Sequence, residues 1–441
     1  MNMSARRFAL VLPFILVASL LIAQSPDVSK KKDLAIFNIG WYGWSIPLET
    51  LGSIDQKTRK VFVDLGRFNV IGIEQRLSSG GLSEFIAAIK KAKESSVVIP
   101  EKFQFGEATL TEADWNSLVG AFIVAAPVVS SFSSKWNDKA LTFETKLTVH
   151  VTFVDIAGGG ATLGVAEVET SGSDKKDQFA SIKSAIDSIP DQLQYEIRKI
   201  PAFQISSKIL SVKRGEVKMA LGRNMGIQVG DEYSVVERST VEGFSDDSEV
   251  GLLLVTSVGS EVSTAQEIYG GKSITPEAAL QEIPRLGIDF DPYAHLFLGT
   301  AGLDFVPGFR AVATRGYIGF RPLATVQIPL GQMFSFATVL IIPVDVAVGG
   351  ELNVNAGRLS LTGWGAVGAG YVHLSEAITG TDTKTDFLAH LGVQAWGKAA
   401  LLISRDMRVF GEAGLDYWIP INTLFKPYGG LGVGGGVELK L

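Results

Sequence analysis

The chain has 441 residues, a formal net charge of −6 and no cysteine. This length exceeds one ordinary hydrophobic core and indicates two to four domains. The lack of cysteine excludes disulfides, thiolate metal sites, cysteine nucleophiles and lipoprotein acylation. A mildly acidic chain without basic clusters argues against nucleic acid as a partner.

The first residues have the organisation of a secretory signal peptide. Arg6 and Arg7 precede an apolar run over residues 8–22, and Ala23, Gln24 and Ser25 follow as a cleavage region. The run is shorter than the ~20 apolar residues that a spanning helix needs, and no later stretch reaches that length. We therefore expect residues 1–24 to be a signal peptide and no helical membrane span to follow it.

Residues 33–201 alternate between strand and helix patterns, as expected of an α/β domain. Apolar strands are predicted at 34–39, 68–73 and 121–129, and an alternating strand at 141–153 is followed by three glycines and a hairpin partner at 161–168. Helices are predicted from apolar residues at helical spacing, namely Leu48, Leu51, Ile54 and Val61, then Leu82, Phe85, Ile86 and Ile89, and then a run from Phe179 to Ile200. Pro190 predicts a kink or restart in the last helix, and residues 111–114 resemble a capping box.

This order of elements resembles the α/β domain shared by the curli secretion protein G family, the lipoprotein activators of penicillin-binding proteins and the N-terminal domain of the Tol-Pal translocation protein B. The segments that carry the resemblance are 34–39, 66–71, 120–129 and 145–156. The resemblance implies a periplasmic domain that works with secretion or cell-wall machinery.

Residues 205–283 form a different pattern of short strands and turns, with little helix. Gly215, Gly222, Gly226 and Gly230 separate strand candidates in the first half, and apolar segments at 250–255 and 263–266 follow. The segment is similar to the C-terminal domain of flagellar assembly protein T, which implies a small β-barrel-like binding module without chemistry. The attached C-terminal barrel is a departure from that family.

Residues 291–441 hold 24 of the 48 glycines but only 21 of the 86 charged residues. Strands with one apolar and one polar face are predicted at 295–305, 309–320, 323–330, 344–354, 358–371, 386–404, 408–420 and 428–441. Tight turns at 355–357 and 405–407 alternate with longer connections at 375–384 and 422–427, as in outer-membrane barrels. Eight is an even number, so the first and the last barrel strand are expected to begin and end on the periplasmic side.

The segment resembles eight-stranded barrels of the outer-membrane protein A and X type. A water-soluble β-sandwich or barrel is the alternative, and the low charge favours the membrane.

Side-chain alternation also predicts which charged residues face the barrel lumen. They are Lys398, Arg408, Glu412, Asp416, Glu438 and Lys440, three cations and three anions that we expect to pair. The same parity directs Val437 toward lipid. The interior of an eight-stranded barrel is about wide enough for side chains to fill it. We therefore expect a barrel that conducts no ions and serves as a membrane anchor.

No residue pattern indicates catalysis. The four histidines, His150, His295, His373 and His390, lack metal-site spacing, and residues 158–164 lack the lysine of a phosphate-binding loop. We expect no catalytic, cofactor or metal residues and hence no enzyme. Trp41, Tyr42 and Trp44 form an aromatic group, for which core packing and a binding surface both stay open.

The leading hypothesis is therefore a non-catalytic scaffold or assembly factor for an envelope machine, anchored in the outer membrane with its N-terminal domains in the periplasm. Its expected partners are outer-membrane lipid and a periplasmic protein. The alternative is a small outer-membrane pore or transport component with accessory periplasmic domains. No motif selects among secretion, flagellar and cell-wall pathways.

Overall fold

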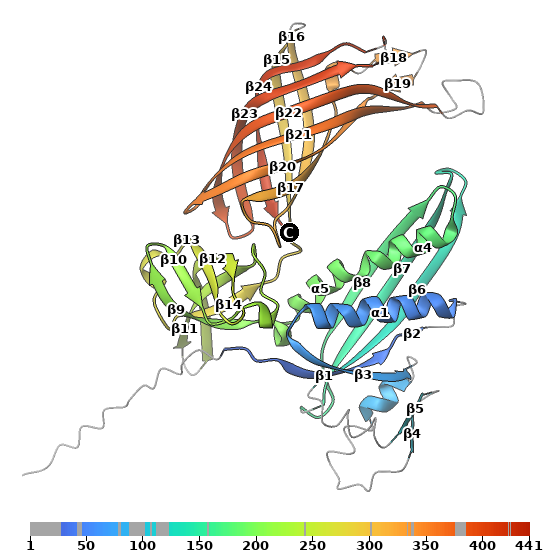
Figure 1. The fold of residues 1–441 in the computed structure, drawn as a ribbon, viewed down its shortest axis with the longest axis vertical. Helices are drawn as coiled ribbons and strands as arrows, with labels where there is room; N and C mark the ends of the chain where they lie inside the picture. The colour runs from blue at the N-terminus through green and yellow to red at the C-terminus, as the bar shows by residue number, and fades with distance from the viewer. Residues whose placement is uncertain are drawn as a thin grey trace, which may run out of the picture.

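The protein consists of an α/β domain and two closed barrels (Figure 1). The computed structural model describes residues 28–41, 46–77, 81–87, 102–105, 108–111, 123–156, 158–241, 244–299, 302–332, 334–336, 339–374, 385–421, 423 and 425–441. The predicted signal peptide lies outside these ranges. The predicted fold class is confirmed: an α/β domain is followed by a small all-β module and by an eight-stranded antiparallel barrel.

One mixed sheet forms the α/β domain. Its strands lie in the order β3-β1-β6-β7-β8, where β1 is parallel to both neighbours and β6, β7 and β8 are antiparallel. The sheet strands are β1 (Lys32–Asn38), β2 (Gly40–Trp41, beside β6), β3 (Phe68–Arg76), β6 (Ile123–Asn137), β7 (Thr142–Asp155) and β8 (Ala161–Asp174). The helices are α1 (Leu48–Asp64), α4 (Gln178–Asp187), α5 (Ile189–Lys199) and the 3-10 turn η1 (Pro201–Phe203). A separate ribbon pairs β4 (Lys102–Phe105) with β5 (Ala108–Thr111).

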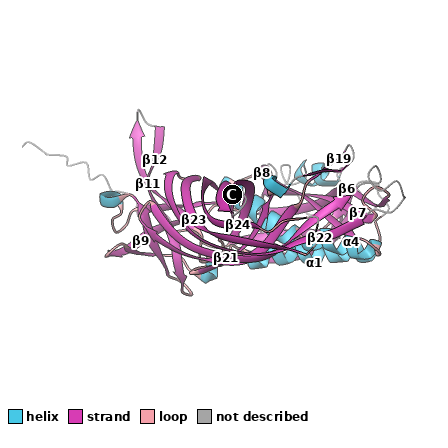
Figure 2. Cartoon of the chain, turned by 90° about the horizontal axis from the view of Figure 1, so that it is seen from above, coloured by secondary structure: helices cyan, strands magenta, loops and turns pink. Residues whose placement is uncertain are grey.

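The main core of this domain lies between the sheet and α1, α4 and α5. Leu51, Ile54 and Val61 of α1 are fully buried there, together with Leu147 and Phe153 of β7. Viewed from above, α1 and α4 lie beside β6 and β7 (Figure 2). A smaller cluster on the opposite face contains Phe85 of the helical residues 81–87, with Leu82 and Ile86 packed against it.

Several sequence predictions for this domain need correction. Leu48 and Phe179 were expected in the core, but they are 77% and 71% exposed. Each lies in the first turn of its helix, before the first residue that the helix buries. Leu141 was expected on the buried face of its strand, but it lies in the turn before β7 and is 50% exposed. Pro190 marks a restart, because α4 ends at Asp187 and a new helix, α5, begins at Ile189 with Pro190 in its first turn. The capping box falls on residues that, apart from Thr111, lie outside the described ranges.

The middle module is a closed six-stranded barrel with an apolar core. Its strands follow the spatial order β10-β13-β12-β11-β14-β9. They are β9 (Ser206–Lys213), β10 (Glu216–Met219), β11 (Glu232–Val241), β12 (Phe244–Val258), β13 (Ser263–Tyr269) and β14 (Ala279–Ile283), with 3-10 turns η2 (Arg223–Met225) and η3 (Gly271–Ser273).

The C-terminal barrel contains the eight strands predicted, each antiparallel to the next, and β15 closes onto β24. They are β15 (Ile288–Gly299), β16 (Gly302–Ala313), β17 (Phe320–Gln327), β20 (Val344–Ala356), β21 (Leu359–Leu374), β22 (Thr385–Ser404), β23 (Met407–Pro420) and β24 (Tyr428–Lys440). Between β17 and β20 lie η4 (Leu330–Gln332) and a hairpin of β18 (Phe334–Phe336) and β19 (Val339–Ile341).

The predicted positions of the first two barrel strands were wrong, and the third strand, predicted at 323–330, is shifted by three residues to Phe320–Gln327. A strand was expected at 295–305, but the chain turns between Gly299 and Gly302, which face each other across β15 and β16. The connection has only two residues, too short to interrupt the alternating pattern of the sequence. The barrel accordingly begins at Ile288 instead of residue 291. None of the helices among the described residues is long and apolar enough to cross a membrane.

Candidate functional site: the barrel lumen and the domain junction

The C-terminal barrel has an apolar exterior and a polar interior. Outward-facing Leu298, Leu303, Leu352, Val367 and Leu431 are each between 62% and 79% exposed. Buried inside are Asp291, His295, Arg310, Thr325, Gln327, Asp345, Glu351, His390, Gln394, Lys398, Arg408, Glu412, Asp416 and Glu438. A barrel in water has the reverse distribution, because burial of apolar surface stabilises it. This barrel is therefore built for an apolar surrounding.

All six residues that the alternation assigned to the lumen are buried, with at most 8% exposure. Lys398, Arg408, Glu412, Asp416 and Glu438 belong to networks inside the barrel. Lys440 differs from them, because it lies at the lower rim and its ammonium donates to Glu232 of the middle module.

The lower half of the lumen holds a continuous chain of alternating charges. The Lys398 ammonium donates to Asp291 and Glu438, each at 3.0 Å, and Arg408 donates to the same Glu438. Arg310 donates to the Asp291 carboxylate at 2.9 and 3.0 Å and to Glu412 at 3.2 Å. Asp291 and Arg310 were missed in the sequence, although Asp289, Asp291 and His295 alternate with apolar residues on β15. With the turn placed after Gly299, the alternation along β15 and β16 assigns Asp291 and Arg310 to the interior.

Aromatic rings fill the middle of the lumen. The His295 ring stacks between Tyr293 and Trp396, with ring centroids 4.3 and 3.9 Å away. His295 Nε2 lies 2.9 Å from a Glu412 oxygen, and the Trp364 indole donates to the other oxygen at 2.9 Å. The rings and the carboxylate thus occupy the centre of the barrel together.

The upper half of the lumen is a network of carboxylates and neutral donors. Asp416 accepts hydrogen bonds from Trp396 at 2.5 Å and from Gln394 at 2.9 Å. The Tyr428 hydroxyl donates to Asp345, and His390 Nδ1 lies 3.7 Å from that carboxylate. The interior is therefore filled with polar groups at all three levels, and most of them are paired. Among the exceptions are the His390 ring nitrogens and the Trp418 indole nitrogen, which are buried without a hydrogen-bond partner among the described residues.

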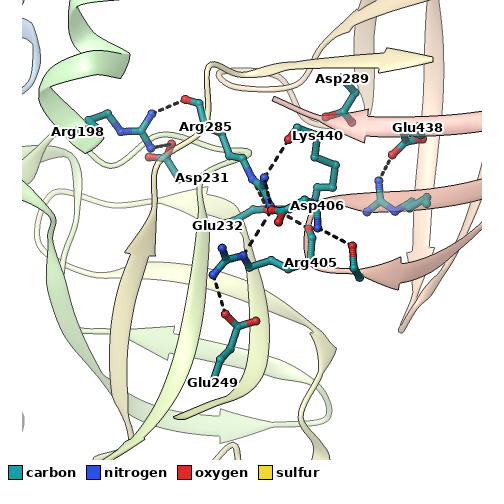
Figure 3. A network of polar contacts seen from close by, with 12 residues as sticks. Arg198, Asp231, Glu232, Glu249, Arg285, Asp289, Arg405, Asp406, Glu438 and Lys440 are labelled. Atoms are coloured by element: carbon teal, nitrogen blue, oxygen red, sulfur yellow. Dashed lines mark hydrogen bonds and ion pairs between the residues drawn. The ribbon is translucent and has the colours of Figure 1, made fainter. Parts of the chain in front are cut away.

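Below the barrel, Arg285 in the linker joins the middle module to the barrel (Figure 3). Its guanidinium donates to Glu232 at 3.1 Å, to Asp406 at 2.7 Å and to the backbone oxygens of Arg405 and Lys440, both at 2.9 Å. Burial opposes ionisation of Glu232, but the charges of Lys440 and Arg285 outweigh it and lower the Glu232 pKa. One buried carboxylate thus holds a cation from the linker and another from the last barrel strand.

Each of the three lower turns of the barrel contacts the middle module. In turn 314–319, the Gly316 N–H donates to the Val229 oxygen at 2.8 Å. At turn 357–358, the Arg358 guanidinium lies 4.5 Å from the centre of the Tyr269 ring. At turn 405–406, Arg405 donates to Glu249 at 3.0 Å. These separate contacts hold the module against the mouth of the barrel.

A second buried ionic cluster joins the middle module to the α/β domain. Glu282 accepts hydrogen bonds from Arg67 at 2.6 Å and Arg198 at 2.7 Å, and Asp231 lies 3.2 Å from Arg198. Asp231 also accepts from Arg315 of the barrel turn at 2.7 Å, so this cluster reaches all three domains. Burial alone would raise the pKa of Glu282, but the charges of the two arginines lower it to about 2.

Two glycines allow the backbones of the domains to approach one another. A Cβ on Gly226 would lie 1.9 Å from the Leu65 oxygen of the α/β domain, and one on Gly230 would lie 2.3 Å from the Thr314 oxygen of the barrel. Both have positive φ, which glycine adopts without strain. The middle module is therefore fitted closely on both sides.

A cavity of about 210 Å³ lies between the middle module and the lower mouth of the barrel. Glu232 and Arg285 line it from below, and Arg321, Arg408 and Lys440 line it from the barrel. Arg321 pairs with Glu351, so the cations on the barrel side are neutralised by carboxylates, like those inside the lumen. The cavity is a small, partly open space at the base of the barrel.

The histidines are scattered over the chain. His150 is half-buried on β7, with Nε2 3.4 Å from Glu167, and the side chain of His373 is outside the described set. In the part of the chain that the structure describes, no three His, Asp or Glu side chains are placed to hold a metal ion. Of the aromatic group near residue 41, Trp41 packs partly buried against the domain core, and Tyr42 and Trp44 lie outside the described ranges.

No family model and no curated protein matches this chain. The C-terminal barrel resembles small outer-membrane barrels of known structure. Neisserial surface protein A is 8% identical, with a TM-score of 0.27 over 35% of this chain and 96% of its own. The N-terminal β-barrel domain of Pseudomonas aeruginosa OprF is also 8% identical, with a TM-score of 0.23 over 35% and 96%. The attachment invasion locus protein Ail of Yersinia pestis is 13% identical, with a TM-score of 0.22 over 34% and 96%. The resemblances of the α/β domain and of the middle module gain no support here and stay predictions.

Proposed function

We propose that this protein is a scaffold anchored in the outer membrane, whose barrel holds two binding domains against the inner surface of that membrane. The reversed polarity of the barrel supports this proposal. A closed barrel satisfies every backbone hydrogen bond between strands, as a lipid surrounding requires. Its outer face offers side chains such as Leu298, Leu352 and Leu431 to lipid.

The filled lumen is the observation that favours an anchor over a pore. An eight-stranded barrel has room for side chains and little else. In this barrel the interior is filled by the ion pairs of Glu438 with Lys398 and Arg408, by the stacked rings of His295 and Trp396, and by carboxylates with their hydrogen-bond donors. The middle module also lies across the lower mouth. Ions would have to break these pairs in order to pass.

The soluble domains supply the surface on which a periplasmic protein would bind. Both ends of an even-stranded barrel lie on one side, and the junction places the α/β domain and the middle module at that end. We propose that the role is non-catalytic and serves a secretion, flagellar or cell-wall machine. This is the class of partner implied by the sequence resemblances of the two domains.

Fractionation and conductance together test the proposal. We expect the mature protein in the outer-membrane fraction, with different gel mobility when heated and unheated, and no stable conductance of the purified full chain in planar bilayers. Recovery as a soluble periplasmic protein would refute the membrane location. Steady single-channel conductance would instead support the pore, and the location would stand.

A further inference from the structure

The α/β domain carries a group of exposed apolar side chains at the turn between β6 and β7 and at the start of α4. We call this group the hairpin corner; it consists of Trp136, Leu141, Phe143 and Phe179. Trp136 is 40% exposed, Leu141 50% and Phe179 71%, and Phe143 is half-buried. The rings of Trp136 and Phe143 pack edge to face, with centroids 5.0 Å apart.

Contacts between the elements hold the hairpin corner together as one surface. The Gln178 side-chain amide, next to Phe179, donates at 3.0 Å to the backbone oxygen of Ser134 on β6. Phe143 faces Asp174 across the β7–β8 ladder, where the chain leaves the sheet to enter α4. The apolar residues of β6, β7 and α4 therefore meet at one end of the domain.

Leu141 is held in a backbone conformation that its side chain disfavours. Its φ is 53°, in the left-handed region that glycine or asparagine occupies at lower cost. Half of the side chain remains exposed, so burial within the described fold offsets little of this cost. An apolar environment outside the chain would account for a leucine at this tip.

Lysines flank the hairpin corner together with carboxylates: Asp138 in the turn is exposed, and Glu144 accepts from the Asn137 side chain at 2.7 Å. The exposed lysines are Lys135, Lys139, Lys175 and Lys176. Asp174 accepts from the N–H groups of residues 176 and 177, and Asp177 accepts from the N–H of Phe179. Tryptophan and flanking lysines are the residues that prefer the boundary between lipid and water, and lysine attracts anionic headgroups.

The same side of the domain adjoins the foot of the barrel. The outer face of α4, through Ala180, Lys183 and Ser184, forms a groove with linker residue Leu286 and with Ile288, the first residue of β15. In Figure 1 the helices lie on the barrel side of the sheet, and the β6–β7 hairpin rises to the level of the lower part of the barrel. The start of α4, next to Phe179, therefore lies on the same side of the domain as the foot of the barrel.

We propose that the hairpin corner is a second membrane contact, which inserts into the headgroup region of the inner leaflet of the outer membrane. This inference rests on the proposed outer-membrane location of the barrel. Two contacts, the barrel and the hairpin corner, orient the α/β domain on the membrane. The opposite face of its sheet, which exposes Val165, is then directed toward the periplasm.

The absence of cysteine allows a clean test by single-cysteine spin labelling of the full chain. The variants are Phe179→Cys and Leu141→Cys in the hairpin corner, Val433→Cys on the outer wall of the barrel and Val165→Cys on the opposite face of the sheet. Each is labelled with a nitroxide in bilayers of phosphatidylethanolamine and phosphatidylglycerol. The ratio of collision rates with oxygen and with a water-soluble nickel complex reports depth in the bilayer.

We expect ratios at Phe179 and Leu141 between the lipid value of Val433 and the aqueous value of Val165, and a decrease toward the Val165 value in purely zwitterionic bilayers. Aqueous ratios at both corner sites, with Val433 in lipid, would overturn the inference and leave the anchor intact. Immobilised corner labels without raised oxygen access would overturn it in favour of a protein contact. An aqueous ratio at Val433 would instead refute the proposed location itself.

Discussion

At the scale of single residues, the lumen shows how buried charges are held in a space without bulk water. Lys398 donates to both Asp291 and Glu438, and each carboxylate has an arginine as a second partner. A buried charge that loses its partner retains the cost of desolvation without the compensating attraction. Each lysine or arginine in the lumen is therefore more important for stability than any exposed charge.

Lys398→Met should destabilise the barrel by about 3 kcal/mol, near the lower end of the range for breaking a buried pair, because Arg310 and Arg408 still bind the two carboxylates. Lys426→Met, in the exposed connection before β24, is the matched control and should change stability by less than about 0.5 kcal/mol. Urea unfolding of both variants in lipid vesicles measures the difference. Equal unfolding free energies would show that the ionic network contributes little.

The outer wall allows a second test at this scale. Val433 lies near the middle of β24 and is 60% exposed, whereas Val437 faces outward close to the lower rim. Val433→Arg should cost about 2–4 kcal/mol if lipid surrounds it, and Val437→Arg about 0–1 kcal/mol, because the cost of an arginine falls toward the interface. The same vesicle unfolding assay compares the two. A similar cost at both positions would argue against a bilayer around this wall.

At the scale of elements, β14 ties the middle module to the α/β domain through one side chain. Glu282 on β14 binds Arg67 before β3 and Arg198 on α5, and its second oxygen accepts from the Ile205 N–H at 3.1 Å. The strand therefore organises three separate segments around a single carboxylate. Protonation of the Glu282 carboxylate would remove the negative charge that Arg67 and Arg198 share.

The pH dependence of this junction follows from the lowered Glu282 pKa. Since the folded pKa of about 2 lies below the ordinary 4.5, the ion pair stabilises the fold fully above pH 4.5 and this contribution is lost as pH falls toward 2. The shift corresponds to roughly 3 kcal/mol. Glu282→Gln should be less stable at pH 7 and should lose less stability between pH 5 and pH 3 than the parent chain.

Hydrogen exchange of β14 and α5 at pH 5 and pH 3 would measure this difference. Glu261→Gln, at an exposed glutamate of the same module, is the control and should behave like the parent. If Glu282→Gln and the parent lost protection equally between the two pH values, the carboxylate would not be the acid-sensitive group of the junction.

At the scale of the whole molecule, strand number and domain contacts together determine the arrangement. The barrel begins and ends at the same edge, and each lower turn binds the middle module. Contacts through Arg315, Arg198 and Glu282 extend this attachment to the α/β domain. Barrel and soluble domains therefore form one unit with a defined top and bottom.

This arrangement predicts protection of the soluble domains in intact cells. Protease added outside should leave residues 25–285 uncut and should cleave only connections at the far end of the barrel, such as residues 421–427 between β23 and β24. Permeabilised cells serve as the control, since there the soluble domains become accessible. Digestion of these domains in sealed cells would show the reverse orientation.

The sequence by itself determined that the C-terminal domain is a β-barrel. For the strands in the second half of that domain, it also determined which side chains face the interior. Successive side chains in a strand point to opposite faces, so Lys398, Glu412 and Glu438 could be assigned to the interior without knowledge of any neighbour. Within the described strands of this barrel, the same rule failed near Gly299, where a two-residue connection left the alternation unbroken. Hydrophobic spacing likewise predicted α1 and its buried residues Leu51 and Ile54.

Only the tertiary structure decided which of these residues meet. Arg310 and Glu412 are 102 positions apart, and Lys440 and Glu232 are 208 apart on different domains. No local pattern encodes such pairs, because they depend on the register with which the barrel closes and on how the domains dock. The hairpin corner is a similar case, since the apolar pattern of Leu141 and Phe179 predicted burial. Their exposure follows from where the sheet ends, which is a property of the assembled domain and not of the segment.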